Sequence, residues 1–152
     1  MQHAAEDAAQ GMTLDSLRKL TGGDRVLIAG SAIVLLSIFL PWWDNGYGNT
    51  ANGLHDWGWL TFLGMLMVLT LLCVRNLVPE ARLPELSVND PVAYIIGGAV
   101  EIAGAVVFWL VNNERLVGGV KYGVFVAVVG GAVTVAGGYV KQLEARQGGV
   151  PR

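Results

Sequence analysis

The sequence predicts an all-α integral membrane protein, in which four helices cross a bilayer and pack as an antiparallel bundle. The chain has 152 residues, of which 53% are hydrophobic and 14% are charged, whereas soluble domains contain about 25% charged residues. It has four long apolar windows, and a hydrocarbon core about 30 Å thick takes roughly 20 helical residues to cross. Val and Ile are abundant in these windows, but an open strand in lipid would leave its backbone groups unpaired, so we expect helices.

The first two predicted spans cover residues 26–43 and 57–74, and neither contains Asp, Glu, Lys, Arg or His. Pro41 falls in the last turn of the first span, where it would end or bend the helix. Asp56 is placed to cap the second span. The loop between the spans, from Asp44 to Asp56, is rich in Gly and Asn, which is typical of turns without a packed core.

The third predicted span covers residues 91–111, with Asp90 as its expected N-cap and Pro91 in its first turn. It carries one acid, Glu101. The fourth predicted span, residues 122–140, is uncharged and rich in glycine. Together the four spans form a membrane domain at residues 25–141.

Two tails flank this domain, at residues 1–24 and 142–152. In the first tail Leu14, Leu17 and Leu20 recur every three residues, so the segment is either a short interfacial helix or a solvated tail. Acidic residues precede the first span and no small-residue cleavage site precedes Pro41, so we expect that span to stay as an anchor rather than to be removed as a signal sequence.

Lysine and arginine are distributed unevenly between the two sides of the predicted bundle. Because basic residues are retained on the cytoplasmic side of a membrane, the richer side is predicted to be cytoplasmic, together with both termini. Arg115 and Lys121 fall on the outer side. The basic residues on the cytoplasmic side are Arg18, Lys19, Arg25, Arg75, Arg82, Lys141, Arg146 and Arg152. Tryptophans suit the headgroup region, and those expected as outer interface anchors are Trp42, Trp43, Trp57, Trp59 and Trp109.

Three segments resemble a group of small four-helix integral membrane proteins of actinobacteria, whose function is unknown. They are Gly22–Trp43 (GGDRVLIAGSAIVLLSIFLPWW), the acidic glycine-rich loop that leads into Trp57, and Ala81–Leu86 (ARLPEL). The order of elements is similar from about Gly22 to Lys141. The resemblance implies this topology and a bacterial cytoplasmic (inner) membrane location, and it implies no reaction.

The composition argues against several other classes of protein. The chain has 10 Lys and Arg against 12 Asp and Glu, a net charge of −2, and no dense basic run, so we expect no nucleic-acid partner. Its single cysteine, Cys73, excludes an internal disulfide and a multi-cysteine zinc site. We expect this thiol to be a small buried hydrophobe.

Glu101 is the candidate functional residue inside the membrane. It lies near the middle of its span, where ionisation costs several kcal/mol unless a partner or water is present. Gly97 and Gly104 share its helix face, so the carboxyl would emerge where another backbone can approach. It is either a carboxylate that carries a proton or binds a cation, or a neutral acid hydrogen-bonded to another helix. The expected partners are Ser31, Ser37, Thr61, Thr70, Thr134 and Glu101 of a second copy.

Small residues form two rows on the fourth span, which predicts close helix contacts, because small side chains let backbones approach in lipid. The rows are Gly123, Ala127 and Gly131, and Gly130, Thr134 and Gly138. Contact within the chain, against the face of Gly97 and Gly104, is favoured over contact between chains, since both rows cannot easily face one partner.

His55, Asp56 and Asp44 are weak candidates for a zinc or manganese site. Three such residues in one loop are more often solvent-facing turn residues, so we predict no metal and no cofactor. The sequence contains no phosphate-binding glycine loop, no nucleophile elbow and no paired-histidine motif.

These features favour a non-enzymatic membrane protein, an accessory, assembly or structural subunit whose partners are the lipid bilayer and either itself or another integral membrane protein. The alternative is a homo-oligomeric ion or proton channel, or a small transporter, that uses Glu101. A membrane sensor or anchor with cytoplasmic docking segments is also compatible, although no feature of the sequence predicts it.

Overall fold

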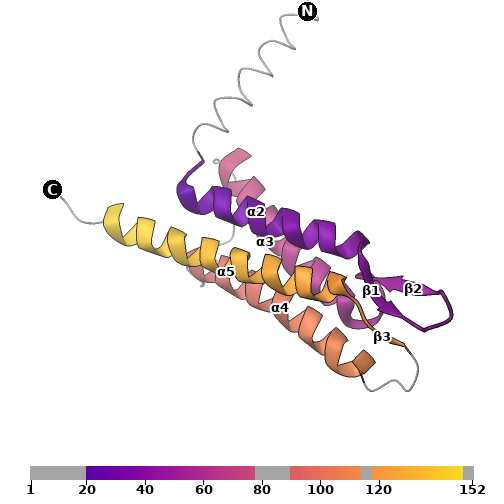
Figure 1. The fold of residues 1–152 in the computed structure, drawn as a ribbon. Helices are drawn as coiled ribbons and strands as arrows, with labels where there is room; N and C mark the ends of the chain where they lie inside the picture. The colour runs from indigo at the N-terminus through magenta and orange to yellow at the C-terminus, as the bar shows by residue number, and fades with distance from the viewer. Residues whose placement is uncertain (1–19, 78–89, 114–117, 149–152) are drawn as a thin grey trace, which may run out of the picture.

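The computed structural model describes residues 20–77, 90–113 and 118–148. The predicted N-terminal interfacial helix, the ARLPEL segment and several of the basic residues used to orient the chain lie outside these ranges. The described part is mostly helical, with the helices side by side and three short strands together at one end (Figure 1).

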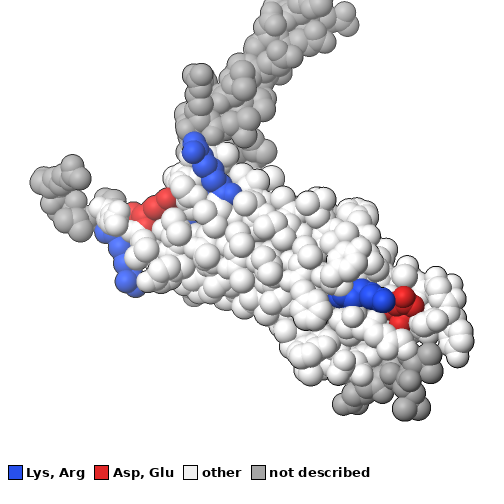
Figure 2. All heavy atoms as spheres, viewed as in Figure 1, with Lys and Arg blue, Asp and Glu red and all other residues white. Residues whose placement is uncertain are grey.

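Four long helices make up the body of the protein. They are α2 (Gly22–Phe39), α3 (Trp59–Leu77), α4 (Asp90–Asn113) and α5 (Tyr122–Gly148). Each contains a window long and apolar enough to cross a membrane, with mean hydropathy between 1.6 and 2.0. On the face drawn in Figure 2, the charged side chains gather at the two ends and leave an uncharged surface between them. The described chain therefore has four helices of the length and composition of membrane spans, as the sequence predicts.

The first helix is shorter than predicted, because α2 ends at Phe39 and not at Trp43. Leu40 is extended, with φ −78° and ψ 157°, which is the conformation that a following proline favours. Pro41 then begins strand β1 (Pro41–Asp44), which pairs with β2 (Thr50–Asn52) and with β3 (Gly119–Val120).

The three strands form an antiparallel sheet in the order β2-β1-β3. A purely helical prediction misses this sheet, which brings the Gly- and Asn-rich loop onto the end of the helices. The Gly53 N–H donates to the Ile38 carbonyl, and the Lys121 N–H donates to the Trp42 carbonyl. The predicted loop is thus a hydrogen-bonded hairpin that joins the end of α2 to the start of α5.

The other helix ends also differ from the prediction. A short 3-10 helix, η1 (Asp56–Gly58), precedes α3, and its N-cap is His55, without a side-chain cap hydrogen bond. Asp56 has a positive φ of 48° and lies inside η1, so it is not the cap. Asp90 is the first residue of α4, and α5 continues to Gly148, beyond the predicted end at residue 140.

Helix α5 is packed between α2 and α4, and each contact is lined by glycine. On one side, a Cβ atom added to Gly30 of α2 would lie 2.7 Å from the backbone nitrogen of Thr134. On the other, a Cβ atom added to Gly98 of α4 would lie 3.0 Å from the carbonyl oxygen of Gly131. Only glycine permits such close approach of two backbones. We call these two contacts the glycine seams of α5.

The prediction that the glycine rows of the fourth span contact the face of Gly97 and Gly104 is wrong. Gly97 and Gly104 face α3, where added Cβ atoms would lie 2.4 Å from Val68 Cγ2 and 2.6 Å from the Thr61 nitrogen. The residue that faces α5 is Gly98, the next position along the helix. Adjacent residues are about 100° apart around a helix, so neighbouring glycines serve two different contacts.

Candidate functional site

Glu101 lies fully buried on α4, between α3 and α5. Its Cγ would be 3.0 Å from a Cβ atom added to Gly64 of α3, and its own Cβ is 3.2 Å from one added to Gly131 of α5. Its side chain is 0% exposed. Glycines on both neighbouring helices therefore make the space that this long side chain occupies.

Neither carboxyl oxygen of Glu101 has a hydrogen-bond partner within the described residues. The Thr134 hydroxyl interacts with this carboxyl, but it donates its hydrogen to the Gly130 carbonyl at 3.1 Å. The contact between Thr134 and the Glu101 carboxyl therefore does not have hydrogen-bond geometry. A buried polar group without a partner costs about 1–3 kcal/mol. Such a carboxyl has unused capacity for a proton, a water molecule or a cation.

The other expected partners of Glu101 are occupied elsewhere or lie apart from it. The Thr61 hydroxyl donates to the backbone carbonyl of Glu101 at 3.1 Å, and the Ser37 hydroxyl donates to Val34. Thr70 is exposed on α3. The Ser31 hydroxyl is buried and, among the described residues, has no hydrogen-bond partner.

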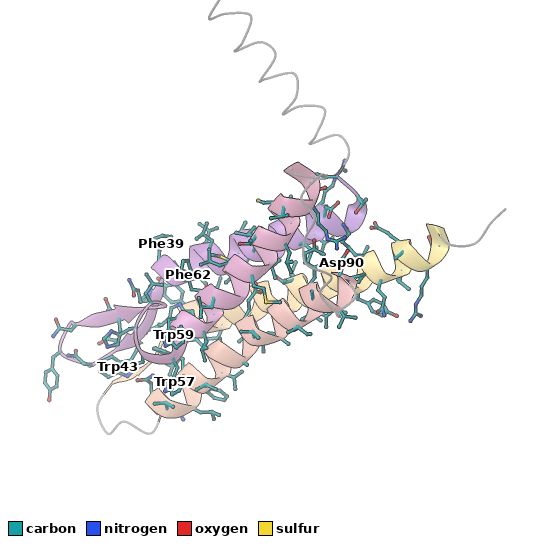
Figure 3. All side chains as sticks on the ribbon, turned by 180° about the vertical axis from the view of Figure 1, so that it is seen from behind. Phe39, Trp43, Trp57, Trp59, Phe62 and Asp90 are labelled. Carbon is teal, nitrogen blue, oxygen red and sulfur yellow. The ribbon has the colours of Figure 1, made fainter. Side chains whose placement is uncertain are left out.

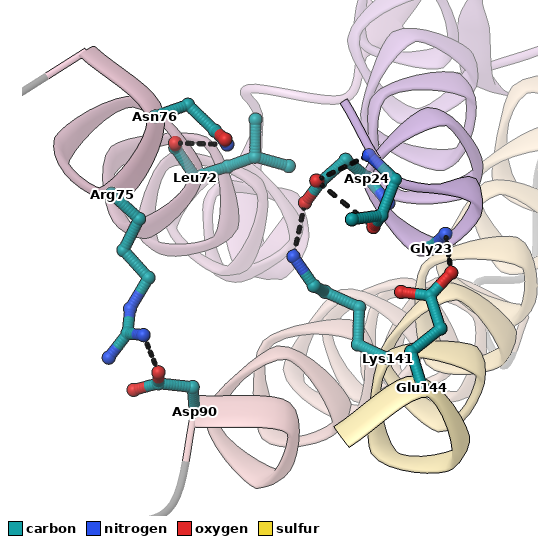
Figure 4. Close-up of polar contacts among 9 residues, drawn as sticks. Gly23, Asp24, Leu72, Arg75, Asn76, Asp90, Lys141 and Glu144 are labelled. Atoms are coloured by element: carbon teal, nitrogen blue, oxygen red, sulfur yellow. Dashed lines mark hydrogen bonds and ion pairs between the residues drawn. The ribbon is translucent and has the colours of Figure 1, made fainter. Parts of the chain in front are cut away.

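A second polar cluster closes the opposite end of the helices from the sheet, and we call it the charged end (Figure 4). Thr21 and Asp24 form a capping box at the start of α2. Asp24, 1% exposed, accepts a hydrogen bond from Lys141 of α5 at 2.5 Å. The Lys141 ammonium also lies 5.9 Å from the centre of the Tyr94 ring.

Two further contacts complete this end. The Gly23 N–H donates to Glu144 of α5 at 3.0 Å, and Arg75 of α3 pairs with Asp90 of α4. The Thr21–Asp24 spacing is a sequence signal for the capping box. No sequence signal identifies Lys141 and Glu144 as its partners, because they are more than 110 residues away.

Trp42 is not the interface anchor that the sequence predicts. It is 0% exposed, and its indole N–H donates to the Ser37 carbonyl at 2.7 Å. Its ring meets Phe108 edge-on, with centroids 5.1 Å apart. Glycines at positions 53, 58 and 123 make room for it, since Cβ atoms added there would lie within 3.2 Å of the ring.

The other four tryptophans are at least partly exposed. Trp57, Trp59 and Trp109 are 47%, 46% and 40% exposed, and Trp43 is half-buried. Figure 3 shows Trp43, Trp57 and Trp59 near the sheet and Asp90 toward the opposite end. Cys73 is exposed, so the expectation that its thiol is buried is wrong.

The weak metal candidates do not come together. Asp44 pairs with Lys121 at 3.3 Å, while His55 lies 3.9 Å from Asp56. Across the described residues, no group of three or more His, Cys, Asp and Glu side chains is placed to hold a metal ion. The Gly46 N–H and the Lys121 ammonium hold the pKa of Asp44 below its ordinary value.

Comparison with protein-family profiles, curated proteins and solved structures found no match.

Proposed function

We propose that this chain is a non-enzymatic subunit of the bacterial cytoplasmic membrane, which assists or assembles with another integral membrane protein or a second copy of itself. Its helices form an antiparallel bundle with both termini in the cytoplasm. This orientation is supported by the described basic residues, since Arg25, Arg75, Lys141 and Arg146 lie toward the charged end and Lys121 lies beside the sheet.

The observation that carries the proposal is how the small residues are distributed. The glycine rows are closed inside the chain, so they hold the bundle together and are not available to a partner. Pairs of exposed alanines four residues apart remain on the outside: Ala99 and Ala103 on α4, and Ala132 and Ala136 on α5. In lipid, such pairs allow another helix to approach closely.

The test is to substitute the exposed pair on α4 and follow assembly in nanodiscs by native mass spectrometry. The Ala99→Phe/Ala103→Phe variant should lose the partner or the second copy, because two rings would fill the contact. Leu66→Phe, which places the same ring at an exposed site on α3, is the matched control and should keep the complex. A wild-type monomer that binds no partner in native membranes would refute the proposal.

A second function is favoured by one observation, the buried carboxyl of Glu101 without a hydrogen-bond partner. In this alternative the chain is an oligomeric ion or proton channel or a small transporter, in which Glu101 carries the moving proton or cation. Intramembrane acids commonly mark such pathways, and one acid from each copy can form a ring around a pore.

Flux into liposomes distinguishes the two functions. If Glu101 carries the ion, liposomes with the wild-type protein should show ion or proton flux, and liposomes with Glu101→Gln should show none. The control Glu144→Gln, which changes an acid at the charged end, should keep the wild-type flux. If the chain is a packing subunit, wild-type liposomes should be no more permeable than empty ones, and Glu101→Gln should leave assembly unchanged.

A further inference from the structure

A groove of about 640 Å³ lies between the end of α2 and the sheet hairpin. Its size falls within the range of small-molecule pockets, about 300–1,000 Å³. One side is apolar and includes Phe39, Leu40 and Trp43. The other side is polar, and the elements that supply it are β2, the turn before β2 and the approach to η1.

The apolar side continues the outer surface of α2. Phe39, the last residue of that helix, is 73% exposed, and Leu35 and Leu36, one turn earlier, are 41% and 65% exposed. Side chains three and four residues apart share one face of a helix. Because α2 can cross a membrane by length and composition, an acyl chain lying along this face would lead directly into the groove.

The polar side consists of hydrogen-bonding groups of Asn, Thr and His side chains. Asn49, Thr50, Asn52 and His55 line it, and all four are exposed. Asn52 uses its side-chain oxygen to accept from the Leu54 N–H, which leaves its amide NH₂ group as a donor. Among the residues that the structure describes, no Asp, Glu, Lys or Arg lines the groove, so this lining offers no fixed cation to a phosphate group.

We propose that this groove binds a membrane lipid whose headgroup is uncharged and carries hydroxyl groups, as in a glycolipid. The acyl chain lies along Leu35, Leu36 and Phe39. The headgroup hydroxyls bond with the amides and hydroxyl of the polar side, and Trp43 provides an aromatic surface beside them. This inference rests on the membrane location in the proposed function and not on the assembly role.

Native mass spectrometry of the protein in mild detergent tests the proposal. The protein is mixed with equal amounts of monoglucosyl diacylglycerol, phosphatidylglycerol and phosphatidylcholine with identical acyl chains. The glucosyl lipid should be retained about five-fold more than either phospholipid, which is the factor expected from one net hydrogen bond. Equal retention of the three lipids, or a preference for either phospholipid, would overturn the proposal.

Variants then locate the lipid. Asn49→Ala/Thr50→Val removes two polar groups of the groove and should reduce retention of the glucosyl lipid to that of phosphatidylcholine. Thr70→Val makes the same kind of change at an exposed site on α3 and should have no effect. Retention that survives the double variant would refute the assignment to this groove. Flotation with phosphatidylcholine vesicles separately tests the membrane location, so its failure cannot be mistaken for failure of the groove.

Discussion

The two ends of the molecule hold α2 against α5 by different physical means. At the sheet end, the buried contacts are neutral: Trp42 fills a space made by glycines, and backbone hydrogen bonds join the end of α2 to the start of α5, while the Asp44–Lys121 ion pair there is partly exposed. At the charged end, the contacts are ionic, and they join Asp24 and Gly23 to Lys141 and Glu144. The same pair of helices is therefore closed mainly by packing at one end and by a buried charge pair at the other.

Because the contacts differ, the two ends should tolerate different kinds of substitution. Truncating a packed aromatic side chain lowers the free energy of unfolding in proportion to the volume removed, and added salt changes this loss little. An ion pair around a buried carboxylate fails when either partner is lost, because the remaining charge has no compensation. Substitutions should therefore be judged by volume at the sheet end and by charge balance at the charged end.

The largest effect is expected at the sheet end, for Trp42→Ala. Removing a fully buried tryptophan costs about 3–5 kcal/mol, and here it also leaves the Ser37 carbonyl without its indole donor. The free energy of unfolding is measured by circular dichroism during SDS titration of mixed micelles. Trp59→Ala, at a ring that is 46% exposed, should cost much less. Equal losses for the two variants would contradict the packing assigned to Trp42.

At the charged end, Lys141→Met should destabilise the protein by about 2–3 kcal/mol, because it leaves Asp24 buried without its cation. This is less than for a fully buried pair, since the Lys141 side chain is 22% exposed. The double variant Asp24→Asn/Lys141→Met should recover most of the loss in the same titration. A double variant as unstable as the single one would show that the lysine stem, and not the charge, matters.

A smaller loss, about 1 kcal/mol, is expected for Glu144→Gln, since a neutral amide oxygen accepts the Gly23 N–H more weakly than a carboxylate does. The difference from wild type should shrink as salt is added, because part of the interaction is screened. Arg146→Gln, an exposed change on the same helix, serves as the control and should be nearly neutral.

The smallest effect is a pH dependence of the hairpin. Because the pKa of Asp44 is held below its ordinary value, its contacts stabilise the hairpin at neutral pH. They are lost as the pH falls below about 4, through the lowered pKa. Hydrogen exchange of the Gly46 amide should therefore show reduced protection at acid pH. In Asp44→Asn, this change of protection with pH should disappear.

The helices could be predicted from the sequence, because length and hydropathy alone decide which segments can cross a bilayer. The sheet could not, since its strands are short and contain the Gly, Asn and Pro that normally indicate turns. Trp42 and Trp43 are adjacent and chemically identical, and only the tertiary structure decides which of them is buried. The same holds for Gly97 and Gly98, which face α3 and α5.

The candidate site was only partly predictable. Glu101 stands out as the one acid of an apolar segment, and the structure buries it completely. Three of its expected hydroxyl partners, those of Ser37, Thr61 and Thr134, however, donate to backbone carbonyls on their own or neighbouring helices. Sequence shows that such hydroxyls exist, but the carbonyl groups competing for them become visible only when the helices are in place.

The position of α5 between α2 and α4 has a consequence for biosynthesis. Protein synthesis proceeds from the N-terminus, and α5 follows the other three helices in the chain. Helices α3 and α4 can pair as soon as both are inserted, but α2 has its most extensive contacts with α5. Until α5 is synthesised, the glycine faces of α2 and α4 lack the helix that they contact in the folded chain. The contacts of α5 with α2 and α4 can therefore form only as a late step, after α3 and α4 have had time to pair.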